Sequence, residues 1–276
     1  MYPCFFLLMV ARAATILDIA IHTNWCPGET KEKYQRWHKG YIHIVLNILE
    51  KHDLYLKPEK CAFKQKEINY LGIIVEQGVL KMDPKKIQGV ANWSPPKTVT
   101  EVRQFLGFTG YYQYFIPNYS KIVRPLLDLT KKTIAWYWEN NQTKAFEMLK
   151  SLICYKPILL QPNFTRCFYL QTDASAYGMG AILSQAAGTT DSPLIKNSKL
   201  KLHPITYYSA TFSPTEWNYN IYKRELLAIM KSLAHWCHYL GWTKFPFVIL
   251  TNHANLQYWK APQNLNHKMV QWHTDL

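Results

Sequence analysis

The first part of the chain combines one long helical pattern with several short strand patterns. From Glu29 to His52 the apolar residues recur at intervals of three and four, which predicts an amphipathic helix. Thr15–Thr23 alternates loosely between apolar and polar residues, and this alternation predicts a strand before the helix. Further strand-like runs follow the helix: Leu54–Leu56, Glu67–Val75 and Val79–Lys81. A helix among short strands is typical of an α+β arrangement.

Residues 84–130 carry the pattern of a small group of helices. Asp83 followed by Pro84 is typical of an N-cap and a first helical residue, and the helix that they begin is expected to end near Trp93. Prolines interrupt the apolar spacing after this point. Two further helices are predicted: Thr98–Tyr114 and Ser120–Thr130. We therefore expect a small α-helical subdomain.

The last part of the chain alternates between helix and strand patterns. A helix is predicted over Asn141–Ile153, and the Ser/Thr/Lys-rich stretch 186–201 is expected to be a loop. A long helix is predicted from Ser213 or Thr215 to Leu240. Strands are predicted at four places: Phe168–Asp173, Gly180–Ser184, Ile205–Ser209 and Phe247–Thr251. This alternation predicts a mixed sheet with helices, an α/β arrangement.

An apolar run, Cys4–Val10, lies near the N-terminus and is followed by Ala11-Arg12-Ala13-Ala14. A short apolar run before small residues resembles a secretory signal peptide. No Lys or Arg precedes this run, and the run is too short to span a membrane. We therefore expect neither secretion nor a membrane partner, and expect the protein in the cytoplasm or the nucleus.

Cysteine usage agrees with that expectation. The six cysteines are scattered, and none forms a C-x-x-C pair or another spacing that suits zinc. A chain of 276 residues can bury a core of its own and does not need disulfides to hold it. We expect buried thiols in a reducing compartment.

The charge balance points to a polyanionic partner. Lys and Arg number 32 against 18 Asp and Glu, which gives a formal net charge of +14. Such an excess favours nucleic acid, because neutralised phosphates release counterions. Aromatic residues make up 15% of the chain, so some rings are expected at the surface, where they can stack on bases. The alternative is a basic protein without such a partner.

Several stretches of sequence, taken in order, resemble one known family. They are Leu54–Phe63, Tyr70–Gly72, Phe105–Phe108, Phe115–Tyr119, Thr172–Ser175, Tyr222–Ile229 and Thr251–His253. Together they resemble the reverse transcriptase–ribonuclease H region of gypsy-type LTR retrotransposon polyproteins, from about Thr15 onward. The family combines RNA-directed DNA polymerase, a nucleotidyltransferase, with a ribonuclease H that acts as a hydrolytic endonuclease. Both activities use magnesium.

The resemblance implies a division of the chain into three parts. Residues 1–83 would be the end of the reverse transcriptase palm, with its hairpins. Residues 84–130 would be the helical thumb. Residues 136–276 would be a ribonuclease H-like domain that stops before the family's last strand and helix. The implied partner is nucleic acid, either an RNA–DNA hybrid or a DNA duplex. The oligomeric state stays open.

The resemblance implies that the polymerase site is mostly absent. In the family, adjacent aspartates of a Tyr-x-Asp-Asp hairpin hold two metal ions. In the matching positions, Thr15 replaces the tyrosine and Leu17 the first aspartate, so that only Asp18 remains. A lone carboxylate cannot bridge two Mg²⁺ ions. Asp18 is therefore either a polymerase remnant or an ordinary acid at the end of a strand.

Two groups of residues resemble nucleic-acid contacts of the family. Tyr70-Leu71-Gly72 matches the hairpin that lies against the primer terminus, although a β-turn that needs Gly72 explains the same residues. The thumb would present Lys85, Lys86, Arg103 and Gln104 to a duplex backbone. The alternative for these four is a solvated helix face.

Half of a ribonuclease H site is present by resemblance. Hard Mg²⁺ prefers oxygen ligands, and the family supplies them as carboxylates. Asp173 matches the first carboxylate in Thr-Asp-Ala-Ser, and Glu225 matches the second in Tyr-x-x-x-Glu-Leu-Leu-Ala. A turn-forming aspartate and an exposed helix glutamate are the structural alternatives. We expect Asp173 and Glu225 to be the remaining metal ligands.

The third position of that site is degenerate. The family has Asp before His253, where this chain has Asn252. Asn keeps the shape and loses one negative charge and one strong oxygen ligand. The fourth carboxylate of the family falls beyond the last residue. Magnesium binding is therefore expected to be weak or lost, and the chain is expected to be impaired or inactive as an enzyme.

Three functional interpretations follow from these residues. The first is a degenerate retroelement fragment that binds nucleic acid and hydrolyses little. The second is an active Mg²⁺-dependent hydrolase that uses Asp173 and Glu225 with a substitute ligand at Asn252. The third is a domesticated nucleic-acid-binding module that keeps its basic thumb. Asn252 weighs against the second, and nothing in the sequence separates the first from the third.

Overall fold

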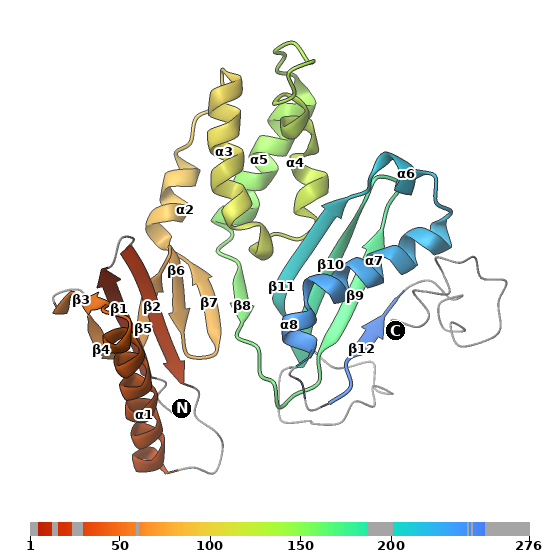
Figure 1. Cartoon of the computed structure of the whole chain (residues 1–276). Helices are drawn as coiled ribbons and strands as arrows, with labels where there is room; N and C mark the ends of the chain where they lie inside the picture. The colour runs from red at the N-terminus through yellow and green to blue at the C-terminus, as the bar shows by residue number, and fades with distance from the viewer. Residues whose placement is uncertain are drawn as a thin grey trace. The chain divides into compact units, whose positions relative to one another are not determined.

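The computed structural model describes residues 5–12, 16–23, 30–58, 61–186, 201–241, 243 and 245–251. They belong to two compact units, Met1–Gly89 and Val90–Leu276. Figure 1 labels the helices and strands of both units.

The first unit contains a sheet built around an unexpected strand. Its elements are β1 (Phe5–Arg12), β2 (Ile16–Thr23), β3 (Tyr55–Leu56) and β4 (Ala62–Gln65). β1 pairs antiparallel with each of the other three strands, so the apolar run near the N-terminus is a central strand. The sequence interpretation missed β1, because it compared this run with a signal peptide. The predicted strand Thr15–Thr23 is confirmed as β2.

A long helix covers part of this sheet. Helix α1 (Lys31–Lys51) confirms the predicted helix, and the Thr30 hydroxyl accepts the Lys33 N–H as its N-cap. Apolar side chains of α1, among them Ile42 and Val45, pack against Ile21 of β2. This burial stabilises the helix on one face of the sheet.

A second, smaller sheet follows in the same unit. It contains β5 (Glu67–Tyr70), β6 (Ile73–Glu76) and β7 (Val79–Met82), paired antiparallel in sequence order. The single strand predicted over Glu67–Val75 is wrong, because Leu71 and Gly72 turn the chain with φ angles of 50° and 80°. Positive φ at both central residues is typical of a tight hairpin turn.

The first helix of the predicted helical subdomain begins as expected. Helix α2 (Pro84–Ala91) starts after Asp83, whose carboxylate accepts the backbone N–H of Lys85 at 2.9 Å. The other oxygen of that carboxylate accepts the Asn69 amide at 2.7 Å. Asp83 therefore caps the helix and fixes it to β5.

Three more helices form the first part of the second unit. They are α3 (Val99–Tyr111), α4 (Tyr119–Asp128) and α5 (Asn140–Cys154), with the short 3₁₀ helix η2 (Gln113–Phe115) between α3 and α4. The predicted helix Thr98–Tyr114 thus ends earlier and tightens into η2. Phe105 of α3 and Phe146 of α5 are fully buried, with ring centroids 4.6 Å apart. Their contact is the centre of the helical core.

A four-stranded sheet forms the rest of this unit. It has the order β11–β10–β9–β12, with bounds Tyr169–Ala174 for β9, Gly178–Ala186 for β10, Leu202–Thr211 for β11 and Val248–Leu250 for β12. β9 pairs antiparallel with β10 and parallel with β12. The short strand β8 (Ile158–Leu160) lies beside β11. All four strands predicted here are confirmed; most of the predicted loop, residues 187–200, lies outside the described residues.

Helices cover one face of this sheet (Figure 1). They are α7 (Ile221–His235) and α8 (Cys237–Leu240), while the short helix α6 (Pro214–Trp217) follows the end of β11 in the chain. Leu226 of α7 packs with Leu170 and Leu183 of the sheet in a shared core. The single long helix predicted over this region is wrong. The Asn220 side chain accepts the Lys223 N–H and starts a new helix there.

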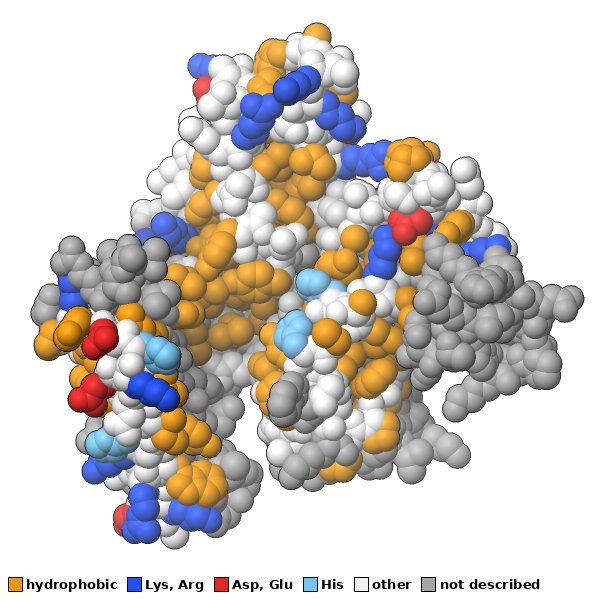
Figure 2. Space-filling model, viewed as in Figure 1, with side chains coloured by type: hydrophobic (Ala, Val, Ile, Leu, Met, Phe, Trp, Pro, Cys, Tyr) orange, Lys and Arg blue, Asp and Glu red, His pale blue; other side chains and the backbone are white. Residues whose placement is uncertain are grey.

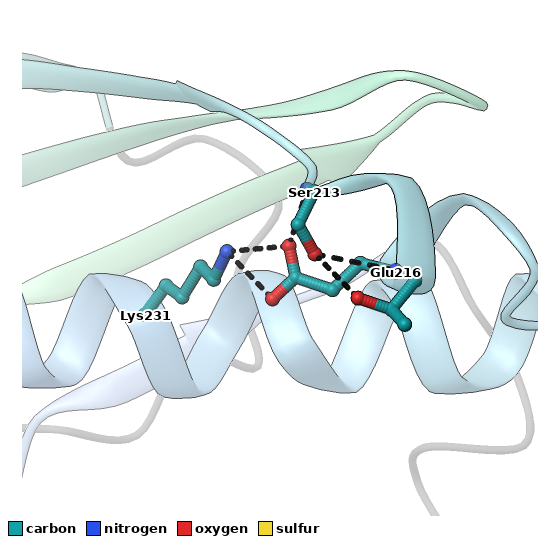
Figure 3. Close-up of polar contacts among 4 residues, drawn as sticks. Ser213, Glu216 and Lys231 are labelled. Atoms are coloured by element: carbon teal, nitrogen blue, oxygen red, sulfur yellow. Dashed lines mark hydrogen bonds and ion pairs between the residues drawn. The ribbon is translucent and has the colours of Figure 1, made fainter.

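The start of α6 is held by a capping box. Ser213 Oγ accepts the Glu216 N–H at 3.4 Å, and a Glu216 carboxylate oxygen accepts the Ser213 N–H at 2.8 Å. Figure 3 shows Lys231 of α7 reaching the same carboxylate, 2.9 Å from Oε1. Burial raises the pKa of Glu216, but the Ser213 N–H and the Lys231 ammonium outweigh burial and leave this pKa below its usual value.

Two further observations concern thiols and membranes. Of the described cysteines, Cys167 is buried, Cys61 and Cys154 are half-buried, and Cys237 is exposed; all four are free thiols. The expectation of buried thiols is therefore wrong for Cys237. Among the described helices, none combines the length and the apolar character that crossing a membrane requires.

We predict that Glu216→Gln lowers the free energy of unfolding by about 1 kcal/mol at neutral pH, because it removes the charge from the capping box. The folded-state pKa of Glu216 is depressed, so its contribution is present above the ordinary glutamate pKa and is lost as pH falls through the folded-state value. Urea unfolding at neutral and at acid pH measures this. The control is Glu147→Gln, at an exposed position. If the stability difference between wild type and Glu216→Gln is as large at acid pH as at neutral pH, the charge of Glu216 is not its source.

Candidate active site

Asp173 lies near the C-terminal end of strand β9 in the four-stranded sheet, and it lines two cavities. It is the exposed residue near the end of β9, and it pairs in register with Gly180 of β10. One cavity of about 310 Å³ and a second of about 610 Å³ are both lined by Asp173, Gly180 and Asn118. The carboxylate named from sequence therefore lies in a concave part of the surface.

The second cavity extends from Asp173 toward the end of β12. Its lining includes Thr172 and Thr251. Leu250 pairs with Gln171 in parallel register, so β12 ends at the same edge of the sheet as β9. Asn252, the degenerate third position, lies outside the described residues.

Glu225 lies on the helix that packs against β9. Helix α7 contacts β9 and β10, and Glu225 is half-buried near its start. The neighbouring Arg224 donates from its guanidinium to the Ser175 carbonyl at 3.4 Å. That hydrogen bond connects the first turns of α7 to the β9–β10 turn, which begins at Ser175, two residues after Asp173.

The β9–β10 turn does not use Asp173 for its hydrogen bonds. The Ser175 N–H donates to the Gly178 carbonyl at 2.8 Å, and the Ser175 hydroxyl donates to the same carbonyl at 2.9 Å. The Gly178 N–H donates back to the Ser175 hydroxyl at 3.2 Å. Ser175 and Gly178 thus close the turn.

The chemistry of the donor set suits a hard cation in part. Asp173 and Glu225 offer carboxylate oxygens, which Mg²⁺ prefers, from two elements that pack together. Among the described residues, no group of three or more His, Cys, Asp or Glu side chains could hold a metal ion. When bound, Mg²⁺ would supply the Lewis acid for phosphodiester hydrolysis.

Asn118 is a site residue that sequence reasoning missed. It has a left-handed φ of 53° just before α4. A Cβ placed on Gly180 would lie 2.0 Å from Asn118 Oδ1. The Asn118 amide therefore lies directly on the β10 backbone at Gly180, the residue that pairs with Asp173 on the neighbouring strand. Asn118 belongs to the stretch Phe115–Tyr119, and Gly180 to Gly178-x-Gly180. Nothing in the sequence indicates that these two stretches meet in the fold.

Neighbouring residues hold Asn118 in this position. The Tyr119 hydroxyl and Thr109 Oγ1 form a buried hydrogen bond of 2.9 Å. Burial raises the pKa of Tyr119, and the Thr109 hydrogen bond lowers it only in part. The Ser120 N–H donates to Ser209 Oγ of β11 at 2.8 Å. The Tyr119 bond thus joins the start of α4 to α3, and the Ser120 bond joins it to the sheet.

The other residues named from sequence lie elsewhere. Asp18 belongs to β2, and its side chain is outside the described residues. Tyr70-Leu71-Gly72 is the β5–β6 hairpin, where positive φ explains Gly72 without a ligand. Lys85 and Lys86 are exposed on α2, and Arg103 and Gln104 are exposed on α3. Arg103 donates to the Thr130 carbonyl at 3.0 Å.

Comparisons with known proteins decide the family. Residues 138–247 match the RNase H-like domain found in reverse transcriptase. The chain is 36% identical over 239 residues to the transposon Tf2-3 polyprotein of Schizosaccharomyces pombe, which covers 87% of this chain, and 37% identical over 224 residues to the Tf2-7 polyprotein. The chain belongs to the reverse transcriptase–ribonuclease H region of gypsy-type retrotransposon polyproteins. It spans 16% of the length of these relatives.

Solved structures support the fold of this retrotransposon segment. It resembles the foamy viral protease-reverse transcriptase in complex with RNA/DNA hybrid, with a TM-score of 0.68, 20% identity and coverage of 94% of this chain and 33% of the other. The same enzyme in complex with dsDNA gives a TM-score of 0.67, 21% identity and coverage of 94% and 51%. At this identity the likeness establishes the mixed α+β and α/β fold.

We predict that Gly180→Ala lowers the free energy of unfolding of the retrotransposon segment by about 1–3 kcal/mol, because the new Cβ overlaps Asn118 Oδ1. Asn118→Gly removes the overlapping amide and suits the left-handed φ. In that background Gly180→Ala is therefore expected to cost much less. Chemical unfolding of the two single variants and the double variant measures the coupling. Equal costs in both backgrounds would refute the close approach.

Proposed function

We propose that this chain is a retrotransposon-derived reverse transcriptase/ribonuclease H-like fragment that binds nucleic acid. Its polymerase site is absent and its ribonuclease H site is degenerate. The observation that carries the proposal is the pair Asp173 and Glu225 on adjoining elements, with Asn252 at the third ligand position. RNA–DNA hybrid or DNA duplex is the proposed partner. The foamy viral structures named above, which are complexes with such duplexes, support this choice.

The charge of the chain supports binding. The formal net charge is +14, and Figure 2 shows Lys and Arg side chains gathered over the helices of residues 99–154. Lys85, Lys86, Arg103 and Gln104 are exposed on α2 and α3 and are proposed as phosphate contacts. Tyr70-Leu71-Gly72 is proposed as a further contact.

The carboxylate count supports weak catalysis. Two-metal hydrolysis needs ligands that collect both ions, so that one metal assists the attacking oxygen and the other the leaving oxygen. Asp173 and Glu225 supply two carboxylates, and Asn252 supplies a neutral amide in place of a third. The proposed Mg²⁺ affinity is therefore low. Asp18 alone, without an adjacent aspartate, cannot support polymerisation.

We propose the same three functional parts that the resemblance implies. Residues 1–83 are the palm end, residues 84–130 the thumb and residues 136–276 the ribonuclease H-like domain. The compact unit Val90–Leu276 would then contain most of the thumb together with that domain. The contacts of Asn118 and Ser120 with the sheet support treating the two as one functional body.

A second candidate function is an active Mg²⁺-dependent hydrolase of RNA–DNA hybrids. It is favoured by the concave setting of Asp173, where two cavities meet. A domesticated binding module shares the binding prediction and differs only in its biological use.

We predict that the chain cleaves a labelled RNA–DNA hybrid at or near the background rate in Mg²⁺. The neutral amide of Asn252 replaces a carboxylate ligand, and this substitution weakens the binding of both metal ions. A gel assay of the full chain, with Asp173→Asn as the matched control, measures this. Robust cleavage that Asp173→Asn abolishes would establish the active hydrolase instead.

We predict that the affinity for the same hybrid falls steeply with salt and depends little on sequence, because phosphate contacts supply the binding energy. Fluorescence anisotropy over a salt series measures the slope of log affinity against log salt concentration. A flat slope, or no binding at low ionic strength, would refute nucleic-acid binding by this chain.

A further inference from the structure

The cavity of about 310 Å³ beside Asp173 carries chemistry that the carboxylate site does not use. One wall is the start of α4, which contributes Lys121 and Arg124, one helical turn apart. The opposite wall is the β9–β10 turn, which contributes Ser175 and Tyr177. The volume is at the lower end of the range for ligand pockets, which is roughly 300–1,000 Å³. A cavity of this volume can hold one small polar group of a ligand together with the atoms bonded to it.

Arg124 is held in place by two aromatic rings. Its guanidinium carbon lies 5.0 Å from the ring centroid of Tyr177 and 5.7 Å from that of Trp217. The two rings meet edge to face, with centroids 6.0 Å apart. Cation–π contact with two rings limits where the guanidinium can move and leaves its N–H groups able to donate to a ligand. Trp217 itself is on α6, whose start is fixed by the Ser213–Glu216 capping box.

The two cations lack a carboxylate partner within the described part of the chain. No ion pair there involves Lys121 or Arg124, although Asp173 lines the same cavity. Tyr177 is 58% exposed and Trp217 is 39% exposed, so the aromatic surface beside the cations faces solvent. A fixed guanidinium, a second cation and exposed rings are the features that bind a sugar–phosphate backbone.

A purely structural use of Arg124 is the competing explanation. Arg124 could serve only to attach α4 to the β9–β10 turn through its ring contacts. Lys121 separates the two explanations, because it is exposed, has no ring contact among the described residues and contributes little to packing. A structural role predicts no effect of Lys121 on ligand binding.

We infer that this cavity is a phosphodiester-binding pocket, in which Lys121 and Arg124 hold one backbone phosphate of a nucleic-acid strand beside the sheet edge at Asp173. The inference rests on the proposed nucleic-acid binding and assigns it to a defined place. The phosphate binds next to the two cations, because the Asp173 charge repels it from the other side. Tyr177 and Trp217 contact the adjoining sugar or base. The helical part thereby positions the strand for the carboxylate site.

The test uses the full chain and a fluorescently labelled RNA–DNA hybrid without divalent ions, followed by anisotropy over a salt series. Lys121→Gln combined with Arg124→Gln is expected to weaken binding about tenfold at low salt. The slope of log affinity against log salt is expected to decrease by about one, because the two cations together neutralise one phosphate. Lys156→Gln with Lys201→Gln removes the same charge from exposed positions outside the helices of residues 99–154 and is the matched control.

Single variants keep the test valid if the double variant folds poorly. Lys121→Gln alone is expected to weaken binding several-fold with an unchanged melting temperature. Arg124→Lys keeps the charge, loses the planar guanidinium with its paired donors and is expected to give an intermediate loss of affinity. If the wild type binds with steep salt dependence and these variants match the control pair, the pocket is refuted while the proposed function stands. If the wild type does not bind, both are refuted.

Discussion

The site depends on a close approach between Asn118 and the backbone of β10 at Gly180. A side chain at position 180 would place its Cβ 2.0 Å from Asn118 Oδ1, so the Asn118 amide can keep this position only where Cβ is absent. Asn118 in turn adopts a left-handed φ, which Asn tolerates better than most residues. Two local backbone features, separated by sixty-odd residues, thus determine one contact.

Several other features follow from that contact. Because α4 begins on the sheet, Lys121 and Arg124 lie against the β9–β10 turn and form a cavity with it. Asp173, the register partner of Gly180, then lies between this cavity and the one that leads to the end of β12. Asp173 of the ribonuclease H-like domain and the two cations of α4 in this way line one cavity.

The elements with strong local signals could be predicted from the sequence. Amphipathic spacing located α1, an Asp-Pro cap located α2, and short apolar runs located the strands around Asp173. The failures have tertiary or single-residue causes. β1 looked like a targeting segment because its apolar residues follow one another without alternation, and the helix after Ser213 was broken by an Asn220 cap that spacing alone does not reveal. Arg124 and Tyr177 could not be paired, because their contact exists only after α4 reaches the sheet.

Hydrogen–deuterium exchange of the full chain, with and without an RNA–DNA hybrid, tests most directly whether thumb and sheet act as one nucleic-acid surface. The account predicts that the hybrid slows exchange in two separate segments, the start of α4 around residues 119–124 and the β9–β10 turn around residues 174–178, in the same titration. Protection of the helical segment alone, with the β9–β10 turn unchanged at saturating hybrid, would contradict it.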